Sequence, residues 1–164
     1  GEHLIALLRG IRHCLIEEGS LDAAFTRGLM PEDNTVASAL TRFVARLDAA
    51  GGLPTNYLLP CPSRGSACKR LFLYLRWMAR KDAVDLGIWK LSPRLLVVPL
   101  DTHMHQMALA LGLTRRKQAS LAAALEVTAA FRRIAPEDPV RYDFALTRVG
   151  IRKEIPLAEF LARF

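Results

Sequence analysis

Residues 95–102 read Leu95-Leu96-Val97-Val98-Pro99-Leu100-Asp101-Thr102, and they are the key to the fold class. This apolar run, rich in β-branched residues, is the only part of the chain with the character of a strand. Pro93 and Pro99 bound it, and the chain has no second run that could pair with it. The sequence therefore predicts an all-α fold.

Helical periodicity fills most of the remaining chain. In residues 34–49 the apolar side chains recur at steps that place them on one helical stripe, namely Val36, Leu40, Phe43, Val44 and Leu47. The same periodicity predicts a helix over about 66–80. Asp138-Pro139 is typical of a cap followed by proline at the first helical position, and it opens a helix that Gly150 ends. We expect about eight helices and no internal repeat.

Length and composition predict one domain over residues 1–164. The chain is 51% hydrophobic and 24% charged, as packed globular proteins are. No apolar run approaches the roughly 18 residues of a membrane span. The start at Gly1 lacks an initiator methionine, so we expect a missing N-terminal segment. The cysteines Cys14, Cys61 and Cys68 are odd in number and irregularly spaced, which favours a reducing cytoplasm over a disulfide framework.

Positive charge is concentrated in two stretches. The net charge is +7, and neither residues 49–81 nor residues 102–125 contain an acidic residue. These stretches hold nine cations, which are Arg64, Lys69, Arg70, Arg76, Arg80, Lys81, Arg115, Arg116 and Lys117. Clustered Arg and Lys in a protein with a pI of about 9.8 indicate binding to a phosphate backbone. A solvated basic face without a partner is the alternative.

The longest irregular connection covers residues 51–65. It holds three glycines and three prolines, and it leads directly into the basic helix predicted over about 66–80. Because long loops inside compact domains are often functional, we expect this segment to contribute to a site.

The segment from Val97 to Met104 resembles the signature of the helix-hairpin-helix DNA glycosylase superfamily, in which an Asp-x-His opens a helix after valine and proline. Residues 107–113, 122–134 and 136–150 resemble the helices that follow in that superfamily, and the resemblance covers roughly residues 34–150. It implies a helix-hairpin-helix DNA-glycosylase-like helical fold and a catalytic role for Asp101. The alternative is that Asp101 is only a helix N-cap.

The resemblance also implies a nucleophilic lysine. Lys69 in Gly65-Ser66-Ala67-Cys68-Lys69-Arg70 lies in the first turn of the basic helix, 32 positions before Asp101. This separation is similar to that in archaeal 8-oxoguanine DNA glycosylase. Residues 59–70 and 75–78 also resemble an uncharacterised bacterial domain family related to that enzyme.

Two features depart from the superfamily pattern. The Leu-Pro-Gly-x-Gly hairpin is absent, and a proline-rich loop ending at Gly65 takes its place. Arg76 stands where the archaeal branch has a second lysine. The last cysteine is Cys68, so the four-cysteine iron–sulfur cluster of some members is excluded, and we expect neither cofactor nor metal. His103 and His105 would join Asp101 in a zinc site only if their segment were not helical.

The implied chemistry assigns a role to each candidate residue. Lys69 would attack the sugar as a neutral amine, whose protonated form the helix dipole and nearby arginines disfavour, and Asp101 would stabilise the sugar cation and accept the proton. A phosphate contact is the alternative role for Lys69. The expected DNA contacts are Arg64, Ser66, Arg70, Arg76, Arg80, Lys81 and His103. Trp77 and Trp89 are candidates to stack on a flipped base, or else core anchors.

The resemblance and the basic stretches together favour a base-excision DNA glycosylase with AP lyase activity, acting on a damaged base, with an oxidised base as one candidate, through a Schiff base on Lys69. The expected partner is duplex DNA with a flipped base, bound by a monomer in the cytoplasm at the nucleoid and not at a membrane. The alternative is a helical nucleic-acid-binding module without catalysis.

Overall fold

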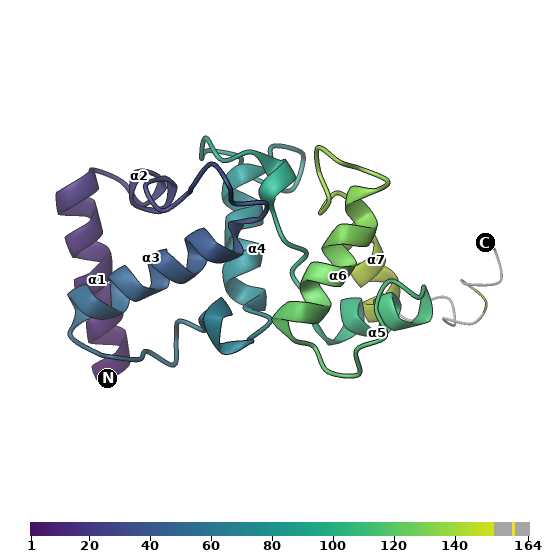
Figure 1. Cartoon of the computed structure of the whole chain (residues 1–164), viewed down its shortest axis with the longest axis horizontal. Helices are drawn as coiled ribbons and strands as arrows, with labels where there is room; N and C mark the ends of the chain where they lie inside the picture. The colour runs from purple at the N-terminus through teal and green to yellow at the C-terminus, as the bar shows by residue number, and fades with distance from the viewer. Residues whose placement is uncertain (153–158, 160–164) are drawn as a thin grey trace.

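The computed structural model describes residues 1–152 and Glu159, and within them the protein is all-α, as the sequence predicts. Figure 1 shows α1, α2 and α3 at one end, α5, α6 and α7 at the other, and α4 between them. The seven α-helices of the described part, against about eight expected, are α1 (Glu2–Glu18), α2 (Leu21–Thr26), α3 (Val36–Gly51), α4 (Lys69–Ala79), α5 (Thr102–Ala110), α6 (Leu121–Arg132) and α7 (Asp143–Arg152). Two 3-10 helices, η1 (Pro62–Arg64) and η2 (Pro93–Leu95), precede α4 and α5. No helix in this part is long and apolar enough to cross a membrane.

The strand-like run of residues 96–100 is a buried, extended segment without a strand partner. The backbone N–H of Val98 donates to the hydroxyl of Thr128 on α6 at 3.0 Å, and that hydroxyl donates to the carbonyl of Ala124 at 2.7 Å. A side chain thus satisfies the backbone donor that a neighbouring strand would otherwise bind. The segment ends at Asp101, where α5 begins.

Helices α1 and α3 cross at very short range. A Cβ atom on Gly10 of α1 would lie 2.5 Å from the carbonyl oxygen of Leu47, and one on Gly51 would lie 2.5 Å from that of Ala6. Each helix therefore contributes a glycine where it meets the backbone of the other.

One connected cluster of buried apolar residues extends from Cys14 on α1 to Val140 before α7. Its largest fully buried side chains include Phe25, Leu40, Phe72, Leu75 and Met104. Elements from both ends of the molecule contribute to this core, and α4 lies between the two ends (Figure 1).

Several helix ends differ from the sequence prediction. Thr35, rather than Asp33 or Asn34, caps α3, because the Asp33 carboxylate instead pairs with Arg42. Asp138 does not cap a helix, because its carboxylate accepts a hydrogen bond from Arg80; α7 begins only at Asp143 and continues through Gly150.

Candidate functional site

Lys69 and Asp101, far apart in sequence, meet at the surface of the folded protein. The Lys69 Nζ atom lies 3.5 Å from Oδ2 of Asp101. Lys69 is the first residue of α4 and Asp101 is the N-cap of α5, so the pair forms where two helices begin. The lysine side chain is 50% exposed and the aspartate 14%, so the amine is open to a large ligand while the carboxylate is sheltered.

The two oxygens of Asp101 have different partners. Oδ1 accepts a hydrogen bond from the backbone N–H of Met104 at 2.7 Å, which is the capping interaction of α5. Oδ2 faces Lys69. The capping hydrogen bond to Oδ1 fixes the orientation of the carboxylate. This orientation keeps Oδ2 directed toward the Lys69 amine.

An unusual turn places Lys69. Cys68, the residue before it, has φ 45° and ψ 33°, and it is the only non-glycine with positive φ in the described part of the chain. The Cys68 backbone N–H donates to the Ser66 hydroxyl at 3.2 Å, and its thiol donates to the Pro60 carbonyl at 3.3 Å. Such local strain persists only where the surroundings enforce it. Nothing in the sequence indicates this conformation, because cysteine has no preference for it.

The Cys68 thiol itself is not a candidate nucleophile. It is buried, and burial raises the pKa of the thiol above its ordinary value. The group therefore stays protonated at neutral pH, where a thiolate would be needed for attack. Its contribution to the site is the backbone geometry that it gives to Lys69.

The other expected DNA contacts differ in their exposure and in their partners. Arg70 and Lys81 are exposed, and so is Arg64, whose guanidinium donates to the Thr55 hydroxyl at 3.0 Å. His103 is half-buried in the first turn of α5, two residues after Asp101. Ser66 is half-buried and its hydroxyl accepts from Cys68, so its local role is to shape the turn.

Arg76 and Arg80 are not placed to contact DNA, contrary to expectation. Both are buried, Arg76 with only 3% of its surface exposed. Arg76 pairs with Asp85 at 3.1 Å and Asp143 at 2.9 Å. Arg80 pairs with Asp85 at 2.5 Å and with Asp138 at 2.8 Å. Buried charges need such partners, and arginines engaged in them cannot also neutralise phosphates.

This buried ionic cluster, defined here as Arg76, Arg80, Asp85, Asp138 and Asp143, ties α4 to α7. Burial raises the pKa of Asp143 to about 6, against the opposing charge of Arg76. The cluster is therefore a structural device between α4 and α7 and not a phosphate-binding surface.

The two tryptophans have different environments. Trp89 is half-buried and packs against the core, with its ring 5.7 Å from that of Phe25 and 5.5 Å from that of Tyr74, an environment that favours the core-anchor alternative. Trp77 on α4 is 42% exposed, so stacking by this residue stays a prediction.

The zinc-site alternative required a non-helical segment at His103 and His105, and both residues lie within α5. His105 is buried, and its Nε2 atom is 2.8 Å from the carbonyl oxygen of Arg116. This ring therefore anchors the loop before α6 and is engaged away from Asp101.

Comparison with known families places the chain. Residues 1–152 match the family described as "Protein of unknown function (DUF2400)", and the protein belongs to that family. No match is found among curated proteins or among solved structures. The functional argument therefore depends on the geometry of the site.

Proposed function

We propose that the protein is a base-excision DNA glycosylase with AP lyase activity, in which Lys69 is the nucleophile and Asp101 its partner. One observation carries the proposal: the 3.5 Å approach of an exposed amine to a sheltered carboxylate at two helix N-termini. Glycosidic cleavage needs a nucleophile and a negative charge beside the sugar, and this pair supplies both. The resemblance of both segments to the helix-hairpin-helix glycosylases supports the same assignment.

In the proposed reaction the Lys69 amine forms a bond to C1′ of the damaged nucleotide. The bond from C1′ to the base breaks, and its electron pair leaves with the base, which takes up a proton. Asp101 accepts the proton that the amine gives up and stabilises the positive charge on the sugar. The sugar ring then opens, with O4′ protonated, to give the Schiff base from which the strand is cleaved by loss of the C2′ proton and the 3′ phosphate.

The positions of the exposed cations are compatible with a duplex at this site. Arg64 precedes Lys69 on η1 and Arg70 follows it on α4, and both are exposed. A cation next to the nucleophile would neutralise a phosphate beside the damaged nucleotide. We assign phosphate binding at this site to Arg70, which adjoins Lys69 on α4, because Arg64 donates to Thr55 and lines a separate pocket and Lys81 follows the far end of α4.

The alternative is a nucleic-acid-binding module in which Lys69 contacts phosphate and no reaction occurs. The exposed cations fit both functions, and only the pairing with Asp101 favours catalysis. The two functions differ in one product, because only an enzyme forms a bond between lysine and the sugar.

Borohydride trapping tests this difference. The wild-type chain is incubated with duplexes that carry an abasic site or an oxidised, deaminated or alkylated base. We expect a covalent adduct with at least one duplex, no adduct with Lys69→Gln, and an undiminished adduct with Lys90→Gln, which removes an exposed lysine outside the expected DNA-binding set. DNA binding without an adduct on any duplex would establish the alternative and overturn the proposal.

A further inference from the structure

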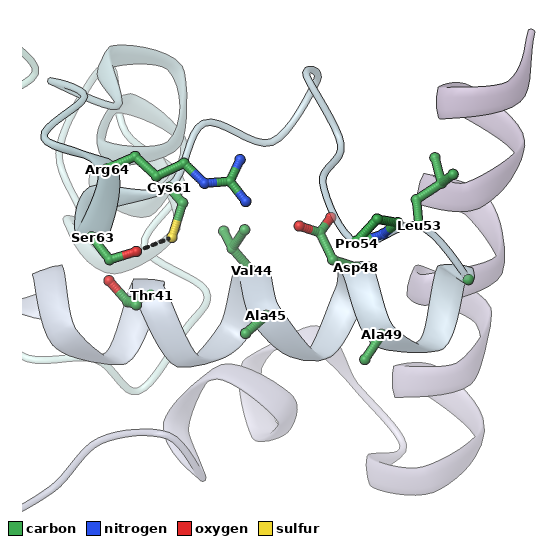
Figure 2. Close-up of a pocket in the computed structure, with 11 residues that line it drawn as sticks. Thr41, Val44, Ala45, Asp48, Ala49, Leu53, Pro54, Cys61, Ser63 and Arg64 are labelled. Carbon is green, nitrogen blue, oxygen red and sulfur yellow. Dashed lines mark hydrogen bonds between the residues drawn. The ribbon is translucent and has the colours of Figure 1, made fainter.

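A second site lies away from the Lys69–Asp101 pair, between the outer face of α3 and the segment of residues 52–64. It is a pocket of about 420 Å³ whose lining includes Val44, Asp48, Leu53, Pro54, Cys61 and Arg64. Figure 2 shows the Arg64 side chain extending over Val44 toward Asp48, whose carboxylate rises from α3. Residues 52–64 belong to the irregular connection of residues 51–65, which the sequence predicts to contribute to a site.

Asp48 is a buried acid, and one of its carboxylate oxygens has no hydrogen-bond partner among the described residues. Only 8% of the residue is exposed, and its Oδ1 atom is buried without a hydrogen-bond partner in the described part of the chain. An unsatisfied buried carboxylate oxygen is costly, and native proteins keep such groups mainly where they serve a purpose. Burial raises the pKa of Asp48, while the backbone N–H of Asn56 and the charge of Arg64 oppose this shift.

Besides Asp48 and Arg64, the lining of the pocket holds two hydroxyl side chains, Thr41 and Ser63, and a set of apolar side chains. Val44, Ala45, Ala49, Leu53 and Pro54 are apolar and suit the faces of a ring. A cation would be attracted by Asp48 and repelled by Arg64, and an anion the reverse, so the two groups together favour neither net charge. A neutral molecule that donates to the Asp48 carboxylate and accepts from Arg64 complements both groups.

We propose that this pocket binds a small uncharged heterocycle with a lactam edge, in which the ring N–H donates to Asp48 and the adjacent carbonyl accepts from Arg64. Oxopurines and oxopyrimidines carry this edge. The site does not rest on the proposed glycosylase function, because Lys69 is not among its lining residues. The base is supplied either as a free nucleoside or within a nucleic-acid strand.

Inosine and 1-methylinosine form the test, since they differ in the lactam hydrogen that Asp48 would accept. Binding to the full chain is measured by calorimetry and by saturation-transfer NMR. We expect inosine to bind, and 1-methylinosine to bind about tenfold more weakly or not at all, the scale expected for a lost hydrogen bond to a charged group. A single-stranded oligonucleotide with one inosine identifies the source: tighter binding than the nucleoside indicates a strand, and equal or weaker binding a free nucleoside.

Variants separate this site from the first. Asp48→Asn should weaken inosine binding by about tenfold or more, and it should fold because it removes a buried charge. The exposed acid variant Glu32→Gln and the nucleophile variant Lys69→Gln should bind inosine as the wild type does. Equal binding of the two nucleosides, unchanged binding by Asp48→Asn, or no binding in either form would overturn the proposal. A failure of borohydride trapping would leave it standing.

Discussion

At the scale of single residues, Asp101 makes two contacts, one that caps a helix and one on which the proposed chemistry depends. One carboxylate oxygen caps α5 through Met104, and the other faces Lys69. An asparagine at this position keeps an oxygen for the cap but loses the negative charge. The two roles can therefore be separated by one substitution.

Asp101→Asn should leave the free energy of unfolding within about 1 kcal/mol of the wild type, because asparagine caps helices about as well as aspartate. Base release should fall by about a hundredfold or more, since the charge that stabilises the sugar cation is gone. Single-turnover excision on the best duplex, measured beside thermal melts, checks both statements. Equal excision rates would show that Asp101 is only a cap.

Asp143 gives a second prediction, in the pH dependence of stability. Burial raises its pKa from 3.8 to about 6, so between those values the folded protein keeps a proton that the unfolded chain has released. Its contribution to stability is therefore fully present below about pH 4 and is lost as the pH rises to about 6. Relative to Asp143→Asn, the wild type should lose on the order of 3 kcal/mol between pH 4 and pH 7. Urea titrations of both proteins measure this difference, and a pH-independent difference would contradict the burial argument.

Sequence reasoning located Lys69 and Asp101, but it misread Arg76 and Arg80. The acid-free stretch looks like a basic surface because the carboxylates that pair with these arginines, Asp85, Asp138 and Asp143, lie beyond its end. Charge counted along a chain does not reveal partners brought from later segments by folding. The strained turn at Cys68 was equally invisible, since tertiary contacts impose it.

At the scale of helices and connections, the periodicity of apolar residues predicted elements better than their ends. The helix expected over 34–49 is α3, Val36–Gly51, whereas the one expected from Asp138 begins at Asp143. Helix ends depend on which polar side chain is free to cap, and Asp33 and Asp138 are engaged by arginines elsewhere. Whether an aspartate caps a helix or binds an arginine is therefore decided by the tertiary structure.

The crossing of α1 and α3 makes Gly10→Ala a sensitive substitution. In an isolated helix the change would stabilise by up to about 1 kcal/mol, because alanine is the better helix former. Here the new methyl group would meet the Leu47 carbonyl at 2.5 Å, so we expect a loss of about 1–3 kcal/mol. Chemical denaturation measures the sign, with Ser38→Ala on the exposed face of α3 as the control. A stabilised Gly10→Ala protein would mean that the helices can separate without cost.

At the scale of the whole molecule, the all-α class followed from one unpaired apolar run, and the structure explains why that run needs no partner strand. Thr128 satisfies its backbone from α6. The resemblance implied a joint role for Lys69 and Asp101, which the structure places 3.5 Å apart, and residues 51–65 were expected to contribute to a site, but the pocket at Asp48 itself was not predicted. A pocket arises where several elements meet, and no local pattern reports it.

The distribution of charge over the molecule predicts a moderate salt dependence of DNA binding. Of the nine cations in the two acid-free stretches, Arg76 and Arg80 are buried in ion pairs, and Arg116 pairs with Glu126. If about three of the others engage phosphates, the log–log slope of affinity against salt should be about −3. Fluorescence anisotropy across a salt series measures it. A slope near zero would rule out phosphate binding.

The 3.5 Å pair is shared between α4 and α5, which are joined by a long connection and held by different neighbours. The distance between the amine and the carboxylate therefore depends on how the elements that hold α4 and α5 pack together. Under the proposed mechanism, a displacement of about 1 Å between the two side chains would reduce the rate about a hundredfold, so a relative that retains both residues could still lack the reaction after a deletion or a repacked core far from them. Within the family, the proposed activity would then depend on how α4 and α5 are packed relative to each other. The presence of Lys69 and Asp101 would be necessary for it but not sufficient.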